Sequence, residues 1–199
     1  MPNVFILAAH PDLAQSRVTR TLLDAVRGLP GVEVRELYRR YPDYAIDVAA
    51  EQAALGEASL LVLLHPLHWY SMPALQKLWL DEVLRFGWAY GPGGDALRGK
   101  TLWLVSSTGG AVESYQAQGY NGHPIHAFLL PYAQTAQLCG MGYRPPLLLH
   151  AAHRASNVEL ARHATAFVAG LTLHQPAAAQ PDIPLDARPA LFSPLKGAA

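Results

Sequence analysis

Five short apolar runs, most of them unbroken by a polar residue, constrain the fold of this chain more than any other feature. They predict strands at Val4–Ala8, Val32–Leu37, Leu60–Leu64, Leu102–Val105 and Leu147–Leu149. A strand that is apolar on both faces must be covered on both faces, which is typical of a parallel sheet flanked by helices.

Helical patterns separate these runs, as the crossovers of a parallel sheet require. Helices are expected over Val18–Leu29, from an Asp47 cap to Ala58, and over Leu75–Val83 after Pro73. Two more are expected over Ile125–Cys139, with a bend or restart at Pro131, and from a capping box at Ser156 to about Leu173. Together they predict a doubly wound α/β domain over residues 1–174. The strand order 2-1-3-4-5 is expected from the fold class and is not displayed by the sequence. Residues 175–199 are rich in Pro and Ala without periodicity, which predicts an extended or disordered tail.

The charge balance excludes several classes of partner. Fifteen basic and 15 acidic residues give a formal net charge of +0 at pH 7, so no positive field favours nucleic acid or anionic lipid. Charged residues make up only 15% of the chain, against roughly 25% in an average domain. This low share indicates a partly covered surface, most simply by a second subunit.

The chain is expected to be cytoplasmic. Cys139 is the single cysteine, so no internal disulfide can form, which fits a reducing compartment. The first residues lack the cationic start of a signal peptide. No apolar run approaches the roughly 18 residues that a membrane span needs.

Three loops leave the carboxyl ends of predicted strands, where open α/β sheets bind ligands. In the first, Ser16 and Thr19 accompany the free N–H groups of a helix start and form an anion site, to which Arg17 adds charge. The alternative is that Ser16 is only an N-cap. Trp69 and Tyr70 in the second loop can support a flat ring, or can plug the core.

The third loop, Ser106–Gly110, contains two glycines, which allow backbone N–H groups to approach a ligand closely. The alternative is a flexible turn. Each signal alone is weak, but three such loops on strand ends of one sheet together predict a ligand site.

Three other patterns are not expected to carry chemistry. Gly94–Thr101 matches the P-loop letters, but it follows a helix and runs into a strand, which reverses the required context. The His-x-x-His pairs at His65, His123 and His150 are not expected to bind metal. Cys139 ends an apolar helix and is expected in the core rather than as a nucleophile.

Several motifs occur in the order found in one enzyme family: His10-Pro11 with Ser16, His65-Pro66-x-x-Trp69-Tyr70-Ser71-x-Pro73, Phe86–Gly91 and Thr108-Gly109-Gly110. Over residues 3–174 the chain resembles the flavodoxin-like NAD(P)H:quinone oxidoreductases. Residues 37–43 and 46–52 are similar to a subgroup of ancillary proteins of glutathione-gated potassium-efflux transporters.

The resemblance implies a three-layer flavodoxin-like fold, a homodimer, bound FMN with FAD as the alternative, NAD(P)H as donor and a quinone as acceptor. It implies that the flavin phosphate and ribityl chain are held by His10, Ser16, Arg17, Val18 and Thr19. The ring would be lined by Leu67, His68, Trp69 and Tyr70, and its pyrimidine edge by Ser107, Thr108, Gly109 and Gly110.

The same resemblance implies that Tyr115 is an active-site tyrosine, with His123 near the position of its expected histidine partner. A second function remains open: a regulatory subunit that binds a cytoplasmic domain of a potassium-efflux transporter, peripherally at the inner membrane.

Overall fold

The computed structural model describes residues 4–173, and the predicted tail at 175–199 lies outside the described residues. A single parallel sheet consists of β1 (Val4–Ala8), β2 (Val32–Glu36), β3 (Leu60–Pro66), β4 (Thr101–Ser107) and β5 (Gly142–Leu149). Its order, β2-β1-β3-β4-β5, confirms the predicted topology.

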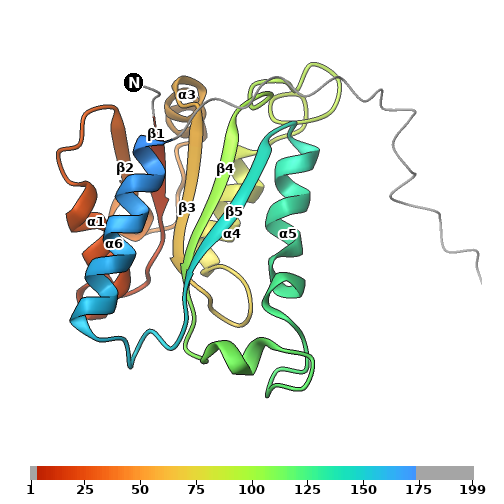
Figure 1. Cartoon of the computed structure of the whole chain (residues 1–199). Helices are drawn as coiled ribbons and strands as arrows, with labels where there is room; N and C mark the ends of the chain where they lie inside the picture. Colours follow the sequence, from red (N-terminus) through yellow and green to blue (C-terminus); the bar gives the residue numbers. More distant parts are fainter. Residues whose placement is uncertain (1–3, 174–199) are drawn as a thin grey trace, which may run out of the picture.

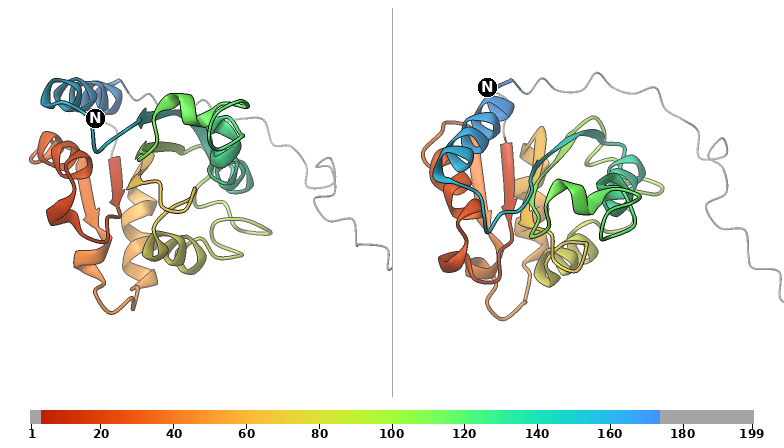
Figure 2. Two further views of the ribbon diagram at one scale, coloured as in Figure 1. Left: turned by 90° about the horizontal axis from the view of Figure 1, so that it is seen from below. Right: turned by 60° about the horizontal axis from the view of Figure 1, so that its bottom comes forward.

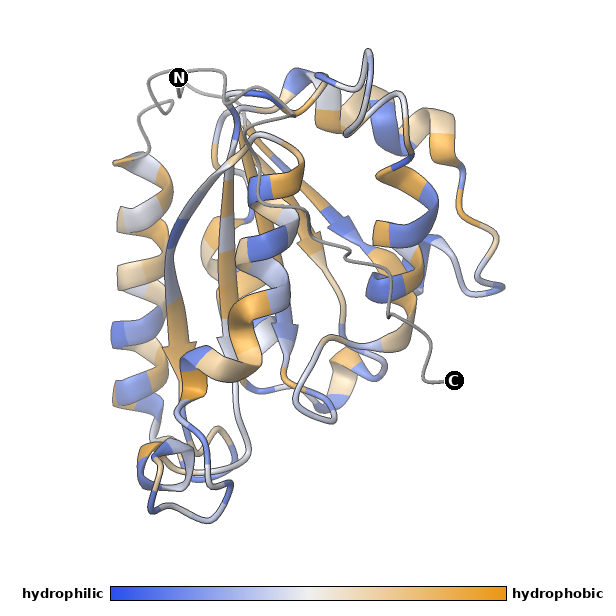
Figure 3. Cartoon of the chain, turned by 90° about the vertical axis from the view of Figure 1, so that its right-hand side faces the viewer, coloured by the Kyte–Doolittle hydropathy of each residue, from blue (hydrophilic) through white to orange (hydrophobic). Residues whose placement is uncertain are grey.

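Helices cover both faces of the sheet (Figures 1 and 2). One layer contains α1 (Val18–Val26) and α6 (Asn157–Thr172), and the other contains α3 (Val48–Glu57), α4 (Ala74–Val83) and α5 (Ile125–Leu138). A short α2 (Leu37–Arg40) and two 3₁₀ turns, Leu13–Gln15 and Val112–Tyr115, were not predicted. Helices carry both hydrophobic and hydrophilic residues, as the hydropathy colours of Figure 3 show.

The central strands divide the core into two layers because successive side chains point to opposite faces. In β1, Phe5 and Leu7 pack with the α3–α4–α5 layer, whereas Val4 and Ile6 pack with α1 and α6. β3 and β4 alternate in the same way, and all residues of β4 are buried. This double burial explains the unbroken apolar runs.

The predicted boundaries of α1 and β5 were wrong for identifiable reasons. Helix α1 ends at Val26 rather than Leu29, because Gly28 adopts a φ of 77° that stops the helix. β5 begins at Gly142 rather than Leu147, because an edge strand tolerates Pro145 and Pro146. Its register shifts opposite Trp103 and Val105.

Helix α5 runs through Pro131 as one element instead of restarting there. Pro131 is exposed, so water can satisfy the carbonyl that loses its helical partner.

A buried carboxylate joins strand β2 to the helices α2, α3 and α4 on one face of the sheet. Glu51 on α3 is 0% exposed. It pairs with Arg35 of β2, and it accepts hydrogen bonds from the Tyr41 hydroxyl at 2.6 Å and from Trp79 Nε1 at 2.9 Å. Because a buried charge is tolerated only when it is paired and hydrogen-bonded, these contacts fix β2, the end of α2, α3 and α4 relative to one another.

Replacing Tyr41 with Phe removes one of these hydrogen bonds and leaves the ring in place. We expect the free energy of unfolding to fall by about 1.5–3 kcal/mol, since the lost bond goes to a buried charge. Urea unfolding measures the change. Tyr120→Phe is the matched control, because Tyr120 is 91% exposed; equal stability of the two variants would contradict the role of the Glu51 contacts.

Candidate functional site

Four loops at the carboxyl edge of the sheet surround one cleft of about 460 Å³, within the roughly 300–1,000 Å³ typical of cofactor sites. It brings together nine residues singled out from the sequence: His10, Ser16, Arg17, Val18, Leu67, His68, Ser107, Thr108 and Gly109. Ala152 and His153, from the loop after β5, also line it and were missed. The only sequence signal for that loop was the His150-x-x-His153 pair.

The start of α1 forms one wall of the cleft. Ser16 Oγ accepts a hydrogen bond from the Thr19 N–H at 3.0 Å. This is a capping-type contact, although the N-cap residue of α1 is Arg17 and not Ser16. Its hydroxyl hydrogen is still available to an anion, as are N–H groups in the first helical turn. Thr19 itself lines a neighbouring cleft rather than this one.

The ionisable residues that line this cleft are all of the basic type. Arg17 extends from the start of α1 and donates to Asn157 Oδ1 at 3.2 Å, while His10, His68 and His153 complete the set, with no carboxylate among the lining residues. Burial, and then the neighbouring His68, lower the pKa of His10. A bound anion would oppose this shift, so the cleft suits a ligand that carries negative charge.

A strained turn follows β3. Trp69 and Tyr70 have φ values of 48° and 64°, and His68 and Ser71 exchange backbone hydrogen bonds of 3.0 and 2.9 Å around them. Tyr70 gains compensating contacts: it stacks on Phe128 at 5.1 Å between ring centroids. Trp69 is 94% exposed, so burial of its side chain within this chain does not offset the strain of its positive φ.

The turn after β4 leaves open space at one glycine. A Cβ atom added at Gly109 would meet nothing within 4 Å, whereas one at Gly110 would lie 3.2 Å from the Tyr115 ring. Gly109 therefore leaves a space at the cleft that any other residue would partly fill.

The structure places Tyr115 and His123 around a shared aromatic ring. Tyr115 lies edge-on to Phe128 at 5.9 Å, and His123 lies edge-on to the same ring at 6.1 Å. Besides Phe128, the ring contacting Tyr115 within residues 4–173 is His150, at 5.5 Å. His150 was not among the candidate site residues.

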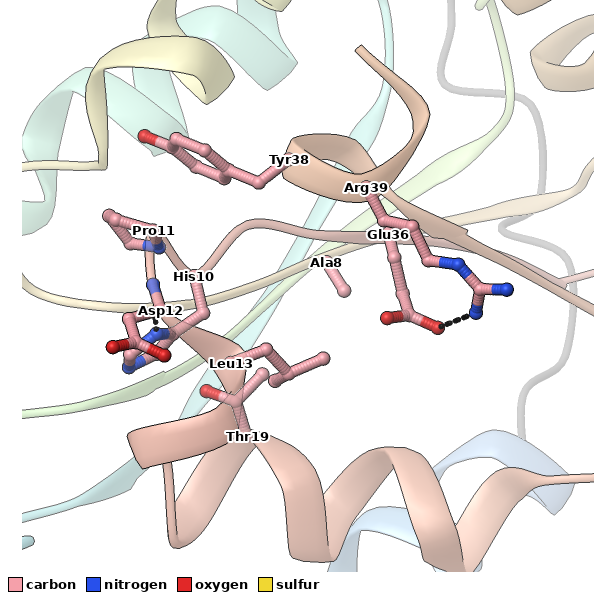
Figure 4. Close-up of a pocket in the computed structure, with 9 residues that line it drawn as sticks. All are labelled: Ala8, His10, Pro11, Asp12, Leu13, Thr19, Glu36, Tyr38 and Arg39. Atoms are coloured by element: carbon pink, nitrogen blue, oxygen red, sulfur yellow. Dashed lines mark hydrogen bonds and ion pairs between the residues drawn. The ribbon is translucent and has the colours of Figure 1, made fainter. Parts of the chain in front are cut away.

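A second cleft of about 230 Å³ shares His10 with the first (Figure 4). Its lining includes the carboxylates of Asp12 and Glu36 together with Arg39. Glu36 and Arg39 form an ion pair at 3.6 Å. Because carboxylates repel an anionic group, this smaller cleft suits a phosphate less well than the larger one does.

Other candidate chemistries find little support. Cys139 is buried, and burial raises the pKa of its thiol to about 11, so it belongs to the core as predicted. Gly94–Lys100 precedes β4, which is the reverse of a P-loop. Among residues 4–173 no three His, Cys, Asp or Glu side chains are grouped to hold a metal ion. No helix in that range is long and apolar enough to cross a membrane.

Comparison with known proteins identifies the family. A family model described as a flavodoxin-like fold matches residues 2–170. The chain belongs to this family. The glutathione-regulated potassium-efflux system ancillary protein KefF of Klebsiella aerogenes is 46% identical over 147 residues, which are 74% of this chain and 82% of that protein.

Solved flavodoxin-like structures agree with this assignment. General stress protein 14 from Treponema denticola, in complex with FMN, is 41% identical with a TM-score of 0.82, and the match covers 86% of this chain and 98% of that one. An NADPH-quinone reductase from P. pentosaceus is 29% identical with a TM-score of 0.80, covering 87% and 99%. These matches confirm the resemblance to flavodoxin-like quinone reductases inferred from the motifs.

The strain in the Trp69–Tyr70 turn gives a stability prediction. Asn adopts positive φ more readily than Trp, so Trp69→Asn is expected to raise the free energy of unfolding by about 1 kcal/mol. The melting temperature should rise by about 2–4 °C. Tyr70→Asn relieves similar strain but loses the Phe128 contact, so it should not stabilise. Calorimetry of both variants tests this, and a destabilised Trp69→Asn protein would contradict it.

Proposed function

We propose that this chain is an FMN-dependent oxidoreductase that transfers a hydride from NAD(P)H to a quinone. The composition of the cleft carries the proposal: it combines the start of α1, basic side chains, a glycine with open space and no carboxylate among its lining residues. The FMN complex of the Treponema neighbour supports FMN over FAD. Residues 1–174 are proposed as the flavin-binding domain.

The residues present fit this cofactor by their chemistry. His10, Ser16, Arg17, Val18 and the adjoining Thr19 would hold the phosphate and ribityl chain, because N–H groups and cations at a helix start favour anions. Leu67, His68, Trp69 and Tyr70 would line the ring, and Ser107, Thr108, Gly109 and Gly110 its pyrimidine edge. When bound, the flavin supplies two-electron chemistry, taking a hydride from NAD(P)H and delivering it to the quinone.

Residues of this chain would orient the reactants and donate the proton that the reduced quinone needs. A quinone that receives a hydride gains negative charge on oxygen, which a phenol O–H can neutralise by donating a proton. Tyr115 is proposed for this step, with His123 as a second candidate beside the same Phe128 ring.

Flavin binding is the decisive measurement. Purified protein is expected to be yellow, or to quench the fluorescence of added FMN, and the flavin released on heating distinguishes FMN from FAD.

Gly109→Leu should weaken FMN binding by about tenfold or more, or roughly 1.4 kcal/mol, because the leucine side chain fills the open space at Gly109. Gly56→Leu is the control, since Gly56 also has nothing within 4 Å of its Cβ position but lies on α3. Protein that binds neither flavin refutes the proposal.

Tyr115→Phe separates a proton donor from a packing residue. We expect unchanged FMN affinity, nearly unchanged hydride uptake from NADPH, and quinone reduction slowed by about 10²–10⁴ if the phenol is a general acid. Stopped-flow measurement of the two half-reactions tests this, with Tyr120→Phe as control. If Tyr115→Phe carries out the oxidative half-reaction at wild-type speed, Tyr115 is a packing residue and not a proton donor.

A homodimer is proposed because large aromatic side chains are exposed near the cleft and in the loop after α4. Trp69 is 94% and Phe86 68% exposed, and a second subunit would cover apolar side chains of this size. Light scattering at micromolar concentration should give twice the chain mass of 21.6 kDa. A mass of one chain would contradict this part of the proposal.

A second candidate function rests on the KefF relative, which is named as an ancillary protein of a potassium-efflux system. We propose as the alternative that this chain binds a cytoplasmic domain of such a transporter, so that it is cytoplasmic and peripheral to the inner membrane. Co-purification of the transporter with a catalytically silent variant would favour binding as the main role.

A further inference from the structure

His150 occupies a position between two parts of the candidate site. It follows β5 directly, is half-buried, and contacts the Tyr115 ring at 5.5 Å between centroids. Its Nδ1 lies 3.0 Å from Thr108 Oγ1 in the turn after β4.

The hydrogen-bond partners of Thr108 determine which nitrogen of His150 carries the proton. Thr108 is 1% exposed, and its hydroxyl donates to the Gly110 carbonyl at 2.7 Å. A hydroxyl has one hydrogen, so it cannot also donate to His150. His150 Nδ1–H must therefore donate to Thr108 Oγ1, which leaves Nε2 without the proton when the ring is neutral.

Backbone bonds fix the same two loops to each other. The Ala151 N–H donates to the Gly110 carbonyl at 2.9 Å, and the Ala152 N–H donates to the Thr108 carbonyl at 2.9 Å. Ala151 has φ of 50°, a strained value for a residue with a side chain. The loop after β5 thus holds the Thr108–Gly110 turn through a chain of bonds that begins at His150.

We propose that His150 is a positioning residue of the flavin site: as the Nδ1–H tautomer it orients Thr108, and through Thr108 the Gly109–Gly110 turn, while its ring supports Tyr115. This inference rests on the proposed function for its consequence in flavin binding, but the tautomer is a property of the protein alone. Burial lowers the pKa of His150, and Glu113 opposes the shift, so the neutral ring is the form present above pH 7.

The tautomer is tested on flavin-free protein. Two-bond ¹H–¹⁵N correlation spectra at pH 7.5 or above distinguish the two neutral tautomers of each histidine, and His150→Asn assigns the signal. We expect His150 to be protonated at Nδ1, and Thr108→Val to abolish this preference. A ring protonated at Nε2 in the unaltered protein overturns the proposal, whether or not flavin binds.

A matched pair of variants tests the consequence. The Asn amide nitrogen can replace Nδ1–H as the donor to Thr108, whereas the Gln amide lies one bond farther along the side chain. We expect His150→Asn to retain FMN affinity within about twofold and His150→Gln to lose about tenfold, the effect of one buried hydrogen bond. Equal losses in both variants indicate ring packing alone and overturn the proposal.

Failure of the proposed flavin function can be distinguished from failure of the His150 proposal. If the unaltered protein binds neither FMN nor FAD, the flavin proposal fails while the spectra still decide the tautomer. Thermal unfolding shows whether each variant is folded. If His150→Asn does not fold, through-bond assignment of the His150 ring signals in the unaltered protein still decides the tautomer.

Discussion

The parallel register of the central strands is the constraint on which the site depends. Ala8 lies beside Leu64, and Leu64 beside Val105, so the three strands end close together at one edge of the sheet. The pairing continues past the strand ends, where the Thr108 N–H donates to the Leu149 carbonyl at 2.9 Å. Because the strands are buried on both faces, a shift of one residue would move their side chains into the wrong core layer. The loops therefore leave the sheet at fixed positions and meet around one cleft.

Stability and strain lie in different parts of the molecule. The two core layers and the paired Glu51 hold the strands and helices together. Positive φ at Trp69, Tyr70 and Ala151 occurs in loops at the edge of the sheet that carries the cleft. Strained backbone persists only where the surrounding structure enforces it, and here the rigid strand ends on either side supply that enforcement. The arrangement is typical of a binding site carried by loops on a stable sheet.

Histidines in this chain have different roles because their surroundings differ. His65 is 1% exposed, and burial lowers its pKa to about 4, so it is a neutral core residue. The His10 and His68 rings lie 6.3 Å apart between centroids at the cleft, and burial together with His68 lowers the pKa of His10. His150 is held by Thr108 in one tautomer. His-x-x-His spacing alone could not distinguish these cases, because it reports distance along the chain and not burial or hydrogen-bond partners.

The sequence by itself determined the presence of the five strands and the five longer helices, since unbroken apolar runs require double burial. It also determined the three principal loops, because the motifs at His10, Trp69 and Gly109 follow strand ends. It also determined the caps at Asp47 and Ser156, which are local interactions between residues three apart. Only the tertiary structure decided contacts between distant segments. It brought His150 to Tyr115 across 35 positions and formed the Glu51 cluster, because neither pairing has a local periodicity to reveal it. The extended β5 was likewise decided by the edge of the sheet, where prolines are tolerated.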